Sequence, residues 1–211
     1  ARGDLGAAGT STTALAFGGD PGLSATEEFN FTAMTVTAAA WASGGALNTA
    51  RYNLGGAGTQ TAGLGFGGYG PDSPPPGYES LTEEYNGSAW TAGENMPAAY
   101  SSGHRAWGTQ TNAIFCGGEN PSLTGATLSY DGTDYTAESN SMNTARVDFG
   151  CAQNGTATAG LIFGGGPGTK TNTESWNGTS WTNEDGLGTG RSANGGFGTA
   201  TAAVNVGGNP F

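Results

Sequence analysis

The chain has 211 residues, of which 41 are glycine, and its 17 acidic side chains against 6 basic ones give a formal charge of −11. This charge predicts no nucleic-acid partner and no anionic membrane partner, because Lys and Arg that neutralise phosphates supply most of the affinity for such surfaces. Glycine at this level favours disorder unless it follows a period, so the presence of a period decides the fold class.

A pair of adjacent glycines follows a short apolar run five times along the chain. The pairs are Gly18-Gly19, Gly67-Gly68, Gly117-Gly118, Gly164-Gly165 and Gly207-Gly208. They recur at intervals of 43 to 50 residues, which indicates an internal repeat rather than disorder. We expect a single domain over 1–211. Its repeats are expected at 1–50, 51–99, 100–145, 146–190 and, only in part, 191–211.

Each repeat begins after a stretch of small residues that usually ends in arginine. Arg51, Arg146 and Arg191 occupy this position, whereas the third repeat has Tyr100 there. We expect one short strand after this residue and a second strand in front of the glycine pair. The last repeat contains only these two expected strands, so it is half a unit.

The first four repeats continue with two aromatic residues on the expected arms of a hairpin. In the first repeat Phe29 and Trp41 are twelve residues apart, which predicts a long loop. In the next three the aromatics are five apart: Tyr85 and Trp90, Tyr130 and Tyr135, Trp176 and Trp181. Between them lies Asn-Gly or Asp-Gly, and these dipeptides predict type I′ turns, in which both central residues have positive φ.

Four short antiparallel strands in every repeat of 40 to 50 residues are typical of a β-propeller blade. The sequence therefore predicts an all-β propeller of about five blades, four of them complete and one a half repeat. We expect a closed ring rather than an open array, because an unpaired strand edge invites unwanted association.

A glycine pair after an apolar strand, followed by spaced Tyr and Trp, resembles the kelch repeat over essentially the whole chain. The resemblance implies that the apolar strand is the second of each blade and that the aromatics on the third and fourth strands pack between blades. It also implies a set of core residues on the second strands. These are Leu64 and Phe66, Ile114 and Phe115, Leu161 and Phe163, and Val204 and Val206.

The candidate catalytic groups each have a simpler structural interpretation. Glu83 and Glu84 form an acidic pair that is repeated in other blades, and neighbours on a strand point to opposite faces, so we expect a solvated or blade-edge strand rather than acid/base chemistry. His104 is the only histidine, which argues against a multi-histidine metal site. Cys116 aligns with strand-core positions, which favours a buried thiol, and a disulfide between Cys116 and Cys151 is an alternative. No catalytic residue, metal ligand or cofactor is predicted, with calcium on the acidic surface as an unsupported alternative.

A long, proline-rich connection after Gly68 is the strongest candidate for a binding loop. Tyr69, Asp72 and Tyr78 lie in or beside it, and exposed loops of this kind often carry recognition residues. A bare spacer is an equally good interpretation of the same segment.

The amino-acid sequence of the repeats, from Gly55 through Trp90, is similar to that of kelch-like virion proteins of marine tailed phages that infect cyanobacteria. This resemblance implies a non-enzymatic structural protein located in the virion, in a fibre, an appendage or capsid decoration. It also implies several copies among other virion proteins, and contact with a host-surface glycan or protein. The alternative is a secreted or surface module that binds glycans, and a hydrolase or lyase on the propeller face is a remote one.

Overall fold

The computed structural model describes residues 4–10, 13–20, 22–30, 40–70, 77–100 and 105–209. Within these ranges all regular elements are β-strands, and they form four-stranded antiparallel sheets that follow one another along the chain, together with two two-stranded sheets. The prediction of an all-β propeller with four complete blades and one half blade is therefore confirmed.

The blades follow one another along the chain, and in each complete blade the strands run in order from the inside to the outside. Blade 1 has β1 (Gly6–Gly9), β2 (Thr13–Phe17), β3 (Thr26–Asn30) and β4 (Ala40–Ser43). Blade 2 has β5 (Gly55–Thr59), β6 (Ala62–Phe66), β7 (Thr82–Tyr85) and β8 (Trp90–Ala92). Blade 3 has β9 (Arg105–Thr109), β10 (Asn112–Cys116), β13 (Thr127–Tyr130) and β14 (Tyr135–Ala137), with an inserted ribbon of β11 (Glu119–Asn120) and β12 (Ser122–Leu123). Blade 4 has β15 (Gly150–Cys151), β16 (Gly160–Phe163), β17 (Thr173–Trp176) and β18 (Trp181–Glu184). Blade 5 has β19 (Ser192–Thr199) and β20 (Ala202–Asn209).

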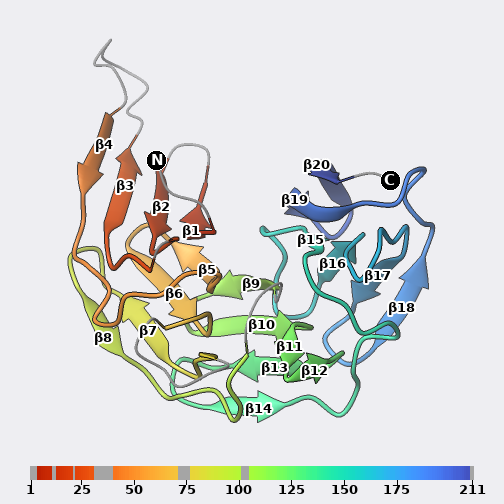
Figure 1. Ribbon diagram of the computed structural model, residues 1–211, viewed down its shortest axis with the longest axis horizontal. Helices are drawn as coiled ribbons and strands as arrows, with labels where there is room; N and C mark the ends of the chain where they lie inside the picture. The colour runs from red at the N-terminus through yellow and green to blue at the C-terminus, as the bar shows by residue number, and fades with distance from the viewer. Residues whose placement is uncertain are drawn as a thin grey trace.

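The five blades lie along an arc around a common axis, with the two ends of the chain at its open side (Figure 1). The inner strands β1, β5, β9, β15 and β19 pack against one another in sequence. Among the described residues no strand pairing joins blade 5 to blade 1. The described residues therefore do not show the expected closed ring, and within them β20 pairs with β19 alone.

The glycine pairs connect each blade to the start of the next repeat. The second glycine donates its N–H to the carbonyl of the residue that opens that repeat: Gly19 to Arg51 at 3.0 Å, Gly68 to Tyr100 at 3.1 Å, Gly118 to Arg146 at 3.2 Å and Gly165 to Arg191 at 2.7 Å. The first glycine of the pair also lies close to this carbonyl, since a Cβ on Gly117 would lie 2.8 Å from the Arg146 carbonyl oxygen. Gly117 also has a φ of 69°, which other residues rarely adopt.

The hairpins form where the sequence predicts them, but their turns differ from the predicted type. Tyr85 pairs with Trp90 across a loop of four residues, and among the central residues only Gly87 has positive φ. Asn86 instead accepts hydrogen bonds through Oδ1 from the N–H groups of Ser88 and Ala89, both at 3.0 Å. The type I′ prediction is wrong because this side-chain cap stabilises a longer loop.

The same Asx-capped loop occurs at Asp131 and at Asn177, each followed by a glycine of positive φ. In blade 1, Phe29 is the strand partner of Trp41, so this hairpin has the longer connection that the spacing predicted. The residues of that connection, 31–39, lie outside the described ranges.

The predicted core is correct in blades 2 and 3 and fails in part toward the end of the chain. Leu64 and Phe66 are fully buried, and Ile114, Phe115 and Phe163 are nearly so. Leu161, in contrast, is only half-buried. Val204 and Val206 are 46% and 45% exposed, so their assignment to the core is wrong. They belong to the half blade, on the side where a following blade would pack.

Candidate functional site

The aromatic residues of the hairpins join neighbouring blades, as the repeat pattern implied. The indole N–H of Trp90 donates to the hydroxyl of Thr26 in the preceding blade at 2.9 Å, and Trp181 donates to Thr127 in the same way at 2.8 Å. Tyr135 shares a 2.6 Å hydrogen bond with Thr82. Each of these outer strands is therefore tied to the first residue of the third strand of the blade before it.

Two tyrosines make a second contact between blades by donating their hydroxyl groups to glutamates. Tyr85 donates to Oε1 of Glu28, and Tyr130 donates to Oε1 of Glu84 at 2.5 Å. Burial, together with the adjacent Glu28 carboxylate, raises the pKa of Tyr85 to about 12. The pKa of Tyr130 is raised by the same causes, burial first and then Glu84. Both hydroxyl groups are thus held in the donor form by the blade interface.

Two fully buried arginines close blades 2 and 4 through ion pairs. Nη2 of Arg51 lies 2.9 Å from Oε1 of Glu83, and Nη2 of Arg146 lies 2.7 Å from Oε1 of Glu174. Burial lowers the pKa of Arg51, and the charge of Glu83 opposes that shift. The expectation that Glu83 lies on a solvated or edge strand is therefore wrong. This residue is 3% exposed, because the arginine compensates its charge inside the blade.

The sequence contains a signal for these pairs that is visible only when two positions are compared. In blades 2 and 4 an arginine at the opening position occurs together with a glutamate in the third strand, and there the two residues form the pair. In blade 3 both positions change together, to Tyr100 and Leu128, and Tyr100 packs against the apolar cluster that contains Leu128.

A cavity of about 310 Å³ lies on the propeller axis and is lined by the inner strands of all five blades. Four residues at one end of these strands have positive φ near 50°, namely Asp4, Asn53, Asp148 and Ala193. Main-chain hydrogen bonds link them in pairs, from Asn53 N–H to the Asp4 carbonyl at 2.9 Å and from Ala193 N–H to the Asp148 carbonyl at 2.8 Å. Asp and Asn tolerate this left-handed conformation better than most residues.

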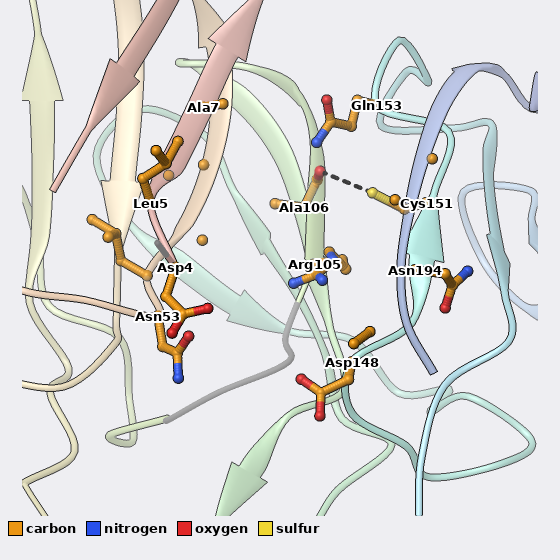
Figure 2. A pocket seen from close by; sticks show the side chains of 17 residues that line it. Asp4, Leu5, Ala7, Asn53, Arg105, Ala106, Asp148, Cys151, Gln153 and Asn194 are labelled. Carbon is orange, nitrogen blue, oxygen red and sulfur yellow. Dashed lines mark hydrogen bonds between the residues drawn. The ribbon is translucent and has the colours of Figure 1, made fainter. Parts of the chain in front are cut away.

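The polar groups of the cavity are a mixture of both charges. Figure 2 shows the guanidinium of Arg105 pointing into the cavity, with Asp4 on one side and Asp148 on another. Asn194 is 1% exposed and donates through Nδ2 to the Phe163 carbonyl at 3.2 Å, and its buried Oδ1 has no hydrogen-bond partner among the described residues. This lining suits a small polar molecule or ordered water.

Cys151 also lines the cavity, and its surroundings are those of an inert thiol. Its Sγ donates to the Ala106 carbonyl at 3.7 Å (Figure 2). Burial raises the pKa of Cys151 to about 11 and raises that of Cys116 as well, so neither is primed as a nucleophile. Both are free thiols, and the open alternative of a disulfide between them is not realised.

Of the three residues predicted for the candidate binding loop, the structure describes Tyr69 and Tyr78. Tyr69 stacks on Tyr52 with 5.1 Å between ring centroids and meets the edge of Tyr78 at 5.2 Å. Tyr52 is the member that sequence reasoning missed, because it follows Arg51 in another part of the repeat. Asp72 and His104 lie outside the described residues.

Within the described ranges no three His, Cys, Asp or Glu residues come together in a way that holds a metal ion. Over the same ranges there is no helix with the length and apolar character that crossing a bilayer requires.

Comparisons with known proteins add no family to this description. No protein-family model matches the chain, and no curated protein gives a match.

Proposed function

We propose that this chain is a non-enzymatic structural protein of a virion, and that it uses the exposed apolar face of blade 5 to assemble with a neighbouring protein. The observation that carries the assembly function is the apolar side of blade 5. Phe197, Val204 and Val206 are 51%, 46% and 45% exposed. Exposed apolar side chains gathered on one face are typical of a protein interface.

The equivalent positions in a complete blade indicate what this face is suited to bind. Val204 and Val206 correspond to Leu64 and Phe66, which are both fully buried between blades 2 and 3. Phe17 and Phe163 in the same repeat position lie over glycines of the next blade, Gly65 and Gly196. The last blade thus has the surface of a blade interface, with no following blade among the described residues.

The virion assignment is supported by the resemblance of the repeats to kelch-like proteins of marine tailed phages, and the acidic surface suits a soluble particle component. In this proposal the protein occurs in several copies in a fibre, an appendage or capsid decoration.

Mass spectrometry of purified virions tests the proposal directly. We expect peptides of this chain at a constant ratio to the major capsid protein through successive density gradients. A chain that is lost from the particle during purification contradicts the virion assignment. Particles from a phage carrying Val204→Ser and Val206→Ser should incorporate less of the protein, whereas Thr179→Ala in an exposed hairpin loop serves as the matched control.

A glycan-binding surface module is the second candidate, favoured by the cluster of Tyr52, Tyr69 and Tyr78. Aromatic rings grouped on one side of a propeller are a surface on which sugar rings can stack. Binding to a glycan array that is lost in Tyr78→Ala, together with absence from every particle, would support this candidate over the first.

A further inference from the structure

The dipeptide Asn-Gly occurs four times in the chain, with the asparagine at Asn86, Asn154, Asn177 and Asn194. Asparagine in front of glycine is prone to lose its side-chain amide, because glycine has no side chain to hinder attack of its main-chain nitrogen on the asparagine Cγ. The dipeptide by itself gives all four places the same reactivity. The structure gives them different surroundings, and these separate two of the places from the other two.

In the hairpin loop of blade 2, hydrogen-bond donors surround the side-chain oxygen of Asn86. This Oδ1 accepts from the main-chain N–H groups of Ser88 and Ala89, both at 3.0 Å, and from the Ser88 hydroxyl at 2.9 Å. Attack on Cγ moves negative charge onto Oδ1, and donors already in place at such distances stabilise that charge. The attacking group is the N–H of Gly87, which has no hydrogen-bond acceptor among the described residues. Asn86 is also exposed to water.

The hairpin loop of blade 4 has the same arrangement. Oδ1 of Asn177 accepts from the N–H groups of Thr179, at 3.0 Å, and Ser180, at 2.8 Å. The hydroxyl of Ser180 lies at 3.4 Å from the same oxygen. Over the described ranges the N–H of Gly178 has no acceptor, and Asn177 is exposed. Both loops therefore combine an unengaged attacking nitrogen with donors for the oxygen that becomes charged.

The other two asparagines lack this combination. Asn154 is exposed, like Asn86, but the N–H of Gly155 is engaged, because it donates to the Ala152 carbonyl at 3.0 Å. The described residues also provide no donor to the Asn154 side-chain oxygen. Asn194 is 1% exposed, so the water that the reaction consumes does not reach it. Asn154 is thus a control within the chain, matched in dipeptide and in exposure.

We propose that the hairpin loops of blades 2 and 4 are self-modifying sites, at which Asn86 and Asn177 convert to aspartate without an enzyme. The main-chain nitrogen of the following glycine loses its proton to base and bonds to Cγ. The amide nitrogen takes up a proton from water and leaves as ammonia, which closes a five-membered imide. Water then adds to one of the two imide carbonyls and opens the ring to aspartate or isoaspartate. The net change is the gain of one water and the loss of one ammonia, with no oxidation or reduction.

Blade 3 shows that an aspartate fits the same loop. Asp131 accepts through Oδ1 from the N–H groups of Asp134 and Thr133, both at 2.8 Å. These hydrogen bonds lower the pKa of Asp131, so its carboxylate is charged at neutral pH. Conversion of both asparagines to aspartate adds one negative charge at each loop and takes the formal charge from −11 to −13. The modification therefore makes the outer hairpins more acidic, and this inference does not rest on the virion assignment.

Incubation of the whole folded chain in a mildly alkaline buffer tests the proposal. Mass spectrometry of proteolytic peptides follows the exchange of amide for carboxylate at each asparagine over time. We expect Asn86 and Asn177 to convert at least roughly ten-fold faster than Asn154, because stabilisation of the charged oxygen lowers the barrier only in the two capped loops. A rate at Asn154 that equals or exceeds the rate at Asn86 overturns the inference.

Two synthetic peptides separate the effect of the fold from that of the local sequence. They copy residues 82–92, around Asn86, and residues 150–160, around Asn154. Without the folded loops both peptides should convert at the same rate. In the folded chain we expect Asn86 to convert at least as fast as in its peptide, and Asn154 to convert more slowly than in its peptide. Slower conversion of both asparagines in the folded chain would mean that the fold only protects, and would overturn the inference.

Two variants test the role of the loop directly. Ser88→Ala removes the hydroxyl donor and should slow conversion of Asn86 by roughly three-fold, with Asn177 unchanged in the same sample. Asp131→Asn creates an Asn-Gly dipeptide in the third capped loop, and the new asparagine should return to aspartate at the rate of Asn86. Thermal melting shows that both variants fold. An unchanged rate at Asn86, or a new asparagine that converts as slowly as Asn154, overturns the inference.

Discussion

Blades 2 and 4 hold their strands with a buried ion pair, whereas blade 3 uses a tyrosine and a leucine at the same two places. The pairs are Arg51 with Glu83 and Arg146 with Glu174, and their counterparts are Tyr100 and Leu128. The main-chain hydrogen bond to the opening residue is present in all of them. The residue type at this repeated position therefore depends on the residue that it contacts on the third strand. The backbone arrangement is the same with the arginine–glutamate pair and with the tyrosine–leucine pair.

The contacts between blades differ in the same paired manner. Tyr85 meets Glu28 and Tyr130 meets Glu84, but the next interface has Ser129 in place of glutamate and Trp176 in place of tyrosine. The indole N–H of Trp176 donates instead to the Ala157 carbonyl at 2.9 Å. A hydroxyl donor is thus present only where an acidic acceptor faces it.

The largest expected effect comes from breaking one ion pair in blade 4. Glu174→Leu leaves Arg146 fully buried without a compensating charge, so we expect a loss of about 3 to 5 kcal/mol in the free energy of unfolding. Urea denaturation followed by tryptophan fluorescence measures it. Glu94→Leu, at an exposed position, should change stability by less than about 0.5 kcal/mol. A loss of equal size in both variants would refute the importance of the pair.

The second prediction concerns the replacement of the ion pair of blade 4 by the tyrosine and leucine that blade 3 has at the same two positions. The double variant Arg146→Tyr with Glu174→Leu removes both charges at once, and well-packed apolar pairs commonly replace buried ion pairs at little cost. We expect it to be about 2 kcal/mol more stable than Glu174→Leu alone. Simple addition of the two single losses in a double-mutant cycle would show that the positions are independent.

A smaller loss is expected at the interface between blades 2 and 3. Tyr130→Phe removes the donor of the 2.5 Å hydrogen bond to Glu84, which should lower the free energy of unfolding by about 1.5 kcal/mol. Tyr52→Phe is the matched control, since the described residues provide no hydrogen bond to its hydroxyl. If the two variants lose the same stability, the bond between blades contributes nothing.

The smallest expected effect concerns the stability of the protein at alkaline pH. The pKa of Tyr85 rises from 10.0 to about 12 on folding, so the protonated hydroxyl is favoured in the folded state. Its contribution is fully present below pH 10.0 and is lost as the pH rises through about 12. We expect Tyr85→Phe to reduce the fall in unfolding free energy over this range. Identical slopes for both proteins would contradict this role.

Much of the fold follows from local sequence pattern, because glycine pairs, alternating strands and aromatic hairpins act over a few residues. The turn type does not, since Asn86 can cap a four-residue loop through its side chain as readily as it can adopt positive φ. The core prediction failed at Leu161, Val204 and Val206 for a different reason. Leu161 lies on the side of blade 4 that faces blade 5, of which the structure describes two strands, and Val204 and Val206 have no following blade among the described residues.

The sequence alone determined the number of blades, the order of strands within them and the aromatic residues that join them. Only the tertiary structure decided that Glu83 meets Arg51, that three tyrosines gather at the loop after Gly68, and that the inner strands enclose a cavity lined by Arg105. The physical reason is separation along the chain. The repeat pattern acts over a few residues, whereas Arg51 and Glu83 lie 32 residues apart within blade 2 and Tyr85 and Glu28 lie 57 residues apart in neighbouring blades, so these pairs meet only after the strands and blades have packed.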